Sequence, residues 1–288
     1  MTKAETDAEA DKIKLYDKSQ LTYANSFPHL GKRIFIKTVE TLTARFQLLY
    51  HMHHWENNPD KNPHFWTSIF DEMDIKVIAA PEQIDNIPAT GPIVVVCNHP
   101  HGLVDGLVVA WLLSKRRDDF QIITRALLNG VAVAEKYLLP ISFPHEEDAV
   151  RKNLQTRKEA VNQIKAGHCI GVFPAGTVST SKTAFGPVVE AEWGKFTSKM
   201  ILHTNARVVP IYFQGSNSRW FQIANRISET FRQSLLMFEI KKSFHKDQKP
   251  IIGKPIERDV LDRYKTDPEG LMAFLRAETL KLNPKAKE

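Results

Sequence analysis

The N-terminal part of the chain contains one helical pattern of apolar residues. Between Lys32 and His53, apolar side chains recur at alternating steps of four and three residues, which places them on one face of a helix. We expect a single amphipathic helix whose apolar face suits either packing on a sheet or lying on a membrane. Basic residues favour the membrane, because each contributes about 1 kcal/mol near an anionic surface. The apolar residues are Phe35, Val39, Leu42, Phe46 and Leu49, and the basic residues are Lys32, Arg33, Lys37 and Arg45.

Beyond residue 74 the pattern changes to short apolar runs that alternate with helical stretches. The run Ile93-Val-Val-Val-Cys97 is continuously apolar and mostly β-branched, as in a strand covered on both faces. This alternation predicts an α/β fold with a mainly parallel sheet flanked by helices. The expected strands are 75–79, 93–97, 120–124, 141–143, 168–173, 207–213, 235–240 and 250–252. The expected helices are 106–116, 131–138, 148–166, 196–203, 219–227 and 268–282.

We expect three segments. Residues 1–30 begin by alternating acid and base without an apolar core, which predicts a flexible tail and not a secretory signal. Residues 31–73 are expected to form the amphipathic helical segment that associates with a membrane, and residues 74–288 the α/β domain. Polar side chains interrupt the most apolar stretch, 93–113, so we expect no transmembrane span.

Charge and cysteine content limit the binding partners and the cellular compartment that we expect. With 39 Lys and Arg against 33 Asp and Glu, the net charge of +6 favours an anionic partner. No basic run with interleaved aromatic residues is present, so nucleic acid is not an expected partner. Cys97 and Cys169 lie in apolar runs and cannot form a disulfide framework, which favours a reducing compartment. We therefore expect a cytoplasmic protein that is peripheral on the inner face of the membrane.

Polar residues follow two of the expected strands where each strand ends. The first block, residues 97–106, places His99 and Asp105 after strand 93–97. The second block, residues 173–179, places backbone NH groups and hydroxyls after strand 168–173. Ligands of parallel α/β sheets bind outside the carboxyl ends of the strands, so these blocks form the candidate site.

The pairing of His99 with Asp105 suits acyl transfer. A histidine oriented by an aspartate takes the proton of an alcohol while that alcohol attacks a thioester carbonyl. Direct attack needs no nucleophilic serine, and the sequence contains no G-x-S-x-G motif.

At these two blocks the chain resembles the glycerolipid, or lysophosphatidic-acid, acyltransferase superfamily. The family signatures appear in order as Asn98-His99 with Asp105 and as Phe173-Pro-Ala-Gly-Thr177. The form Asn-His-Pro-x-Gly-x-x-Asp-Gly is similar to a variant of bacterial members. The resemblance implies the glycerolipid acyltransferase fold, a catalytic dyad of His99 and Asp105, and transfer of a fatty acyl group to a lysolipid hydroxyl in membrane lipid synthesis. It implies acyl-CoA or acyl carrier protein as the donor, and we expect no cofactor and no metal.

The resemblance also assigns residues to substrate binding. Arg151 is the nearest match to an arginine that the family places between its blocks, and Arg125 is the alternative. The full expected set is Asn98, Gly102, Arg151, Phe173, Pro174, Gly176, Thr177 and Ser179.

Two positions of the second block depart from the family pattern. Ala175 stands where the family usually has Glu, and Val178 where an Arg often follows the Thr. Phosphate sites usually supply an Arg, often together with a helix N-terminus. We therefore expect an amino-acid lysolipid, such as a lyso-ornithine lipid, as the acceptor in place of a lysophospholipid such as lysophosphatidic acid.

Two other classes of function stay open. His99, His101 and Asp105 could be ligands of a metal-dependent hydrolase, although Gly106 stands where such clusters have a further His. The chain could also be a non-catalytic lipid-binding module on the same fold. For His101 itself, we expect a supporting role and not catalysis.

Overall fold

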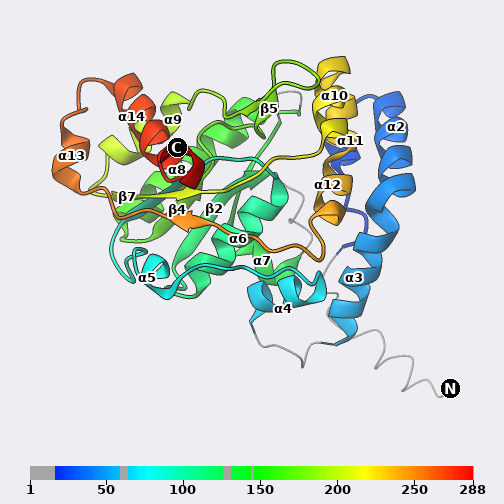
Figure 1. Cartoon of the computed structure of the whole chain (residues 1–288), viewed down its shortest axis with the longest axis horizontal. Coiled ribbons are helices and arrows are strands. Elements are labelled where there is room, and N and C mark those ends of the chain that lie inside the picture. Colours follow the sequence, from blue (N-terminus) through cyan, green and yellow to red (C-terminus); the bar gives the residue numbers. More distant parts are fainter. Residues whose placement is uncertain (1–16, 59–63, 126–130, 144–145, 288) are drawn as a thin grey trace.

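A six-stranded sheet forms the centre of the molecule (Figure 1). The computed structural model describes residues 17–58, 64–125, 131–143 and 146–287. The strand order is β3-β2-β4-β1-β7-β8, and every pairing is parallel except that of β7 with β8. The predicted α/β fold with a mainly parallel sheet is therefore confirmed. The strands are β1 Ile93–Cys97, β2 Phe120–Arg125, β3 Leu138–Ile141, β4 Cys169–Val172, β7 Arg207–Tyr212 and β8 Ile251–Ile252, with a separate pair β5 Thr180–Ser181 and β6 Val188–Val189.

Helices cover both faces of this sheet, which explains the unbroken apolar sequence of β1. Ile93 and Val95 pack with helices α4 and α6 on one face, whereas Val94 and Val96 pack with α8, α9 and α14 on the other. The helices are α2 Leu30–Glu40, α3 Phe46–Asn57, α4 Phe65–Glu72, α5 Pro81–Ile84, α6 Leu103–Ser114, α7 Ala132–Glu135, α8 Ala149–Lys165, α9 Lys195–Leu202, α10 Arg219–Ile227, α11 Glu229–Ser234, α12 Leu236–Lys242, α13 Arg258–Asp262 and α14 Pro268–Leu280.

The N-terminal helix differs from the expected single α-helix. A π-helical turn, Thr41–Arg45, joins α2 to α3. Ile36, Ala44 and Leu48 pack inward, whereas Leu42 and Phe46 are 80% and 71% exposed. One line of side chains therefore packs on the protein, against the 3₁₀ turn and the C-terminal helices α11 and α12, and another line faces outward.

Residues 17–30 differ from the expected flexible tail, while residues 1–16 lie outside the described part of the chain. Leu21, Tyr23 and Phe27 are buried around a 3₁₀ turn, Tyr23–Ser26. The buried carboxylate of Glu40 accepts hydrogen bonds from the Thr22 hydroxyl at 2.5 Å and the Tyr23 N–H at 2.9 Å. This segment is thus tied to α2 and belongs to the folded unit.

Two expected strands were wrong. Residues 236–240 lie in α12 and Leu235 joins α11 to α12, so this segment is not a strand, and Met237 and Ile240 are buried at helical spacing. Residues 75–79 contribute only an isolated bridge between Val77 and Gln248. Figure 1 shows α10, α11 and α12 beside α2 and α3, at one side of the sheet.

Candidate active site

The sheet topology brings the two blocks together. β1 and β4 are parallel neighbours, with Val96 opposite Val172, so the residues that follow each strand emerge side by side. The Ser179 N–H donates to the His99 carbonyl at 2.8 Å, which joins the blocks directly.

His99 is held by a fully buried carboxylate. Its Nδ1 lies 3.1 Å from Asp105 Oδ2, and Asp105 itself lies in the first turn of α6. The same oxygen accepts the N–H of His101 at 2.8 Å and the N–H of Gly102 at 3.1 Å. Gly102 has a φ of 78°, a backbone conformation that favours glycine. The loop between β1 and α6 therefore directs two backbone donors and two imidazoles at one carboxylate.

These donors keep Asp105 ionised. Burial alone would raise the pKa of Asp105, but the imidazoles of His101 and His99 lower this pKa below its ordinary value. An ionised carboxylate only accepts hydrogen bonds, so we assign the proton of the His99 ring to Nδ1. Nε2 then presents a free lone pair, as a general base requires.

His101 shares this carboxylate but faces elsewhere. Its Nδ1 lies 3.0 Å from Asp105 Oδ1. Its Nε2 lies only 3.0 Å from where a Cβ on Gly215 would stand, so this side of the ring packs against the Gly215 backbone. Burial lowers the pKa of His101, but the charge of Asp105, the hydrogen bond to Asp105 and the charge of Glu239 together outweigh burial and raise this pKa overall. Of the two imidazoles, only that of His99 lines the neighbouring cavity.

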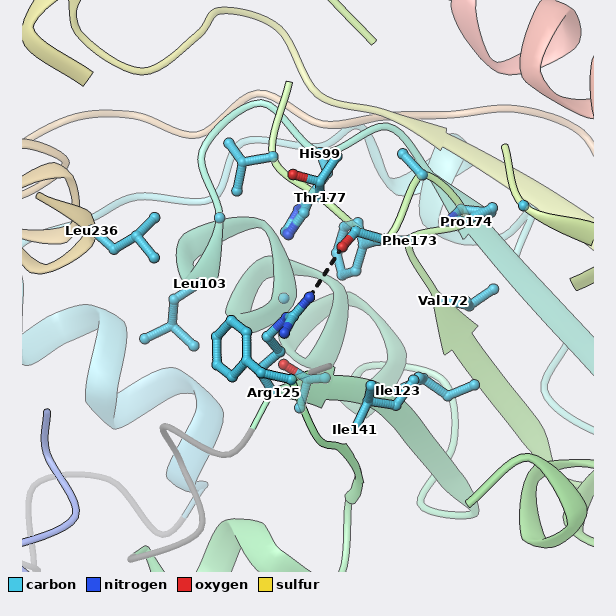
Figure 2. Close-up of a pocket in the computed structure, with 18 of the residues that line it drawn as sticks. His99, Leu103, Ile123, Arg125, Ile141, Val172, Phe173, Pro174, Thr177 and Leu236 are labelled. Atoms are coloured by element: carbon cyan, nitrogen blue, oxygen red, sulfur yellow. Dashed lines mark hydrogen bonds between the residues drawn. The ribbon is translucent and has the colours of Figure 1, made fainter. Parts of the chain in front are cut away.

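A cavity of about 440 Å³ opens beside His99. Figure 2 shows apolar side chains around it from several elements, with the Phe173 ring against His99. The ring centroids of His99 and Phe173 are 4.1 Å apart. The size and the mostly apolar walls suit a ligand with a hydrocarbon chain. The apolar walls include Leu103, Ile123, Ile141, Val172 and Leu236.

Arg125, at the end of β2, is the cation at the centre of Figure 2. Its guanidinium lies over the Phe143 ring, 3.7 Å from the centroid, and Nη2 donates to the Gly176 carbonyl at 3.5 Å. Nη1 is buried and has no hydrogen-bond partner among the described residues. Burial lowers the pKa of Arg125, although an arginine side chain stays charged in proteins. The cavity wall therefore contains a cation, one of whose donors is buried and without a partner among the described residues.

The expected substrate-binding residues separate into two groups. Gly102 and four residues of the second block, Phe173, Pro174, Gly176 and Thr177, line the cavity. The second block turns sharply, since the Gly176 N–H donates to the Phe173 carbonyl at 2.9 Å and Gly176 has a φ of 65°.

The structure does not bring the other three expected residues to the cavity wall. Asn98 is buried and exchanges hydrogen bonds of 2.9 and 2.7 Å with the backbone of Phe213, which ties the end of β1 to the end of β7. Ser179 is buried beside His99. Arg151 pairs with Asp148 at 2.9 Å on the surface and its side chain is 76% exposed, so Arg125 occupies the place expected for it.

Several residues around the site were not predicted from the sequence, and three of them come from unexpected segments. Tyr23 and Leu236 line the cavity from segments expected to be a tail and a strand. Glu190 is buried next to His99 and Ser179. The apolar run Leu21 to Phe27 was an available sign that the tail packs, but nothing local marks Glu190.

Among the described residues, no group of three or more His, Cys, Asp or Glu side chains is placed to hold a metal ion. His99 and His101 both direct Nδ1 at Asp105 and do not converge with it on a common point.

The comparison with known families places this geometry in a class. Residues 80–214 match the family model described as acyltransferase, and this segment contains both blocks. The match confirms the resemblance to the glycerolipid acyltransferase superfamily, and the enzyme is an acyltransferase.

Individual proteins that are similar to this chain have names more specific than the family description. The chain is 28% identical over 209 residues to a lyso-glycine lipid O-acyltransferase of Phocaeicola vulgatus, covering 69% of this chain and 71% of the relative. It is 27% identical over 193 residues to the protein of the same name from Bacteroides thetaiotaomicron, covering 64% and 67%. Among solved structures, it is similar to the 1-acyl-sn-glycerophosphate (LPA) acyltransferase PlsC from Thermotoga maritima, with 17% identity and a TM-score of 0.46 over 88% of this chain and 93% of that one.

Proposed function

We propose that this acyltransferase moves a fatty acyl group from a thioester to the hydroxyl of a lysolipid, with His99 as the base and Asp105 as its partner. The observation that carries the proposal is the position of His99 between a buried, ionised carboxylate and an apolar cavity. Acyl-CoA or acyl carrier protein is the expected form of the donor.

The residues support a direct transfer. The acceptor oxygen attacks the thioester carbonyl carbon and forms the new C–O bond while His99 Nε2 takes the hydroxyl proton. The C–S bond then breaks, and the proton on Nε2 passes to the leaving thiolate, which restores neutral His99. Asp105 stabilises the imidazolium between these two steps. General-base help of this kind contributes about 10²- to 10⁴-fold to the rate.

Arginines in the cavity wall suit an acceptor with a carboxylate. Arg232 is paired with Glu229 at 3.6 Å and Arg157 lies over the Phe196 ring, whereas Arg125 retains a donor without a partner among the described residues. Arg125 offers a planar guanidinium, whose donors match the two oxygens of a carboxylate. The second block adds no further cation, since Val178 stands at the family's arginine position. Both relatives are named for a lyso-glycine lipid, and a glycine linked through its nitrogen keeps one carboxylate. We propose such an amino-acid lysolipid as the acceptor, bound through Arg125.

The enzyme meets its acceptor at a membrane surface, in this proposal. A line of exposed apolar side chains runs along α2 and α3, and α10 adds two more, with α11 in contact with both α2 and α10. We call these residues the apolar helical surface: Leu30, Ile34, Leu42, Phe46, Tyr50, Trp220 and Ile227. Basic residues Lys32 and Lys37 flank the line on α2, as expected for contact with anionic lipid. Within the residues that the structure describes, no helix has the length and apolar character needed to cross a membrane.

A competition assay tests the acceptor. Lyso-glycine lipid and lysophosphatidic acid compete for one labelled acyl thioester, and we expect the glycine lipid to be acylated preferentially. Arg125→Met should raise the KM for the glycine lipid roughly 10- to 100-fold, because a hydrogen bond to a charged group is worth about 1.5–3 kcal/mol. Arg151→Met is the matched control and should leave this KM unchanged. Preference for lysophosphatidic acid, or a larger effect of Arg151→Met, would overturn the acceptor assignment.

A further inference from the structure

A buried carboxylate connects the two blocks from outside both of them. Glu190 lies between β6 and α9 and is 6% exposed. Its Oε2 accepts the backbone N–H of His99 at 3.2 Å and the hydroxyl of Ser179 at 2.5 Å, while Oε1 accepts the indole N–H of Trp193 at 3.0 Å. Both carboxylate oxygens are therefore engaged as acceptors, and His99 is one of the donors.

These contacts close a ring around the His99 backbone. The Ser179 N–H donates to the His99 carbonyl at 2.8 Å, while Glu190 holds the His99 N–H and the Ser179 hydroxyl. Both polar groups of His99's backbone are thereby fixed by residues distant in the sequence. Ala175, at the family's usual Glu position, has no side-chain oxygen with which to make such a bond.

The segment that carries Glu190 is itself anchored. Arg276, on α14, donates to the Glu190 carbonyl at 2.5 Å and to the Ala191 carbonyl at 3.0 Å. The Gly194 N–H donates to the Pro174 carbonyl at 2.9 Å, which links the far end of the segment to the second block. The carboxylate thus has a fixed frame from which to hold His99.

We propose that Glu190 is a positioning residue for the transfer reaction and sets the backbone from which the His99 ring reaches the cavity. Asp105 fixes Nδ1 of that ring and Phe173 packs on its face, but neither contact holds the His99 N–H. Small displacements of a catalytic group lower the rate strongly, because the reacting atoms must approach within about 3–3.5 Å. This inference rests on the proposed role of His99 as the base.

Glutamine cannot replace this carboxylate. Glu190 accepts on both oxygens, whereas an amide accepts on one side and donates on the other. With the amide oxygen toward His99 and Ser179, the amide nitrogen opposes the Trp193 N–H. With the amide reversed, its nitrogen opposes the His99 N–H. Either orientation leaves buried donors facing each other, which costs free energy.

The experiment measures kcat and KM for acylation of lyso-glycine lipid by an acyl thioester. Glu190→Gln should lower kcat by roughly 10- to 100-fold, and KM should stay within about twofold. Trp193→Phe removes the opposing indole donor, so the double variant Glu190→Gln/Trp193→Phe should recover part of the lost kcat. Trp193→Phe alone is the matched control and should change kcat by less than about threefold.

A second background separates positioning from general loss of structure. In His99→Ala, the slow residual transfer should not fall further when Glu190→Gln is added, because the group that Glu190 positions is gone. A further fall there would overturn the proposal, as would a raised KM with unchanged kcat in the single variant. If Glu190→Gln does not fold, Ser179→Ala removes one bond of the ring and should lower kcat several-fold without changing KM, and an unchanged kcat would refute the proposal.

The role of His99 as the base and the role of Glu190 in positioning it can be tested separately. If His99→Ala retains full transfer, the proposed function itself is wrong, whatever Glu190→Gln does. If His99→Ala loses transfer and folded Glu190→Gln stays within about twofold of the parent kcat, only the role of Glu190 is wrong.

Discussion

The cavity has two walls that are built in different ways. The sheet wall consists of residues at strand ends, such as His99 and Phe173, and hydrogen bonds hold it in place through Asp105 and Glu190. The helical wall consists of residues such as Leu236, which packs in an apolar cluster with Phe221, and Tyr23, which a hydrogen bond to Glu40 ties to α2. The sheet wall thus contains the groups suited to chemistry, whereas the helical wall stands between the cavity and the outer surface.

Helix α10 shows how thin that separation is. Phe221 lines the cavity and is fully buried, whereas its neighbour Trp220 is 68% exposed on the outer side. One helix therefore faces both the candidate site and the apolar helical surface. If the walls have separate tasks, changes to the sheet wall should affect the chemical step, and changes to the outer surface should affect attachment alone.

The largest effect is expected in the sheet wall. His99→Ala should lower kcat by at least about 10²- to 10⁴-fold, the usual contribution of a general base. Asp105→Asn should lower kcat nearly as far, because an asparagine cannot both hold the His99 ring with Nδ1 protonated and stabilise the imidazolium cation. His101→Ala should be milder, since His101 does not line the cavity. Loss of transfer in His101→Ala with transfer retained in His99→Ala would reverse the assignment of the base.

An intermediate effect is expected on the apolar helical surface. Leu42→Glu with Phe46→Glu should weaken cosedimentation with anionic vesicles by roughly tenfold or more, because burying one such side chain is worth about 1.5–3 kcal/mol. Transfer to a lysolipid presented in detergent should not change. Val150→Glu on α8 is the matched control, since Val150 is also exposed but lies outside this surface. Equal weakening by Val150→Glu would show that the apolar helical surface is not the part of the protein that binds the vesicles. High salt should release the parent protein from anionic vesicles, because salt screens the attraction between charges.

The smallest effect is expected from the shared carboxylate. Asp105 raises the pKa of His101 despite burial, so protonated His101 stabilises the fold. This stabilisation is complete below the unfolded pKa of about 6.5 and is lost as the pH rises through the raised pKa of the folded state. The melting temperature of the parent should therefore exceed that of His101→Gln most clearly at mildly acidic pH, by about 2–4 °C for each kcal/mol. A difference that grows toward alkaline pH would contradict this account.

The sequence predicts the sheet wall better than the helical wall. The run Ile93 to Cys97 is marked by its β-branched residues, and the turn at Gly176 by its glycine, so both blocks could be located. The run Leu235 to Ile240 is short and apolar, a pattern that strands and buried helices share, and the tertiary structure makes it a helix.

Long-range contacts account for the other differences. Tyr23 joins the cavity because Glu40 binds it, and Glu190 bonds to His99 from a distant segment. Neither contact leaves a periodic pattern in the sequence. Arg125 ends β2 and Arg151 lies in the first turn of α8, and only the folded chain shows which of them reaches the cavity.

The π-helical turn Thr41–Arg45 sets the rotational phase between α2 and α3. An α-helix turns by about 100° per residue, so a wider turn at this point shifts the azimuth of every side chain that follows. With the turn in place, Ile36 and Leu48 share the inward azimuth, and Leu42 and Phe46 share the outward one. Removing one residue from the turn would rotate α3 by about that angle relative to α2, so that the inward and outward lines would no longer be continuous along the two helices. The turn thus aligns the side chains of α2 and α3, so that the two helices together present two continuous faces.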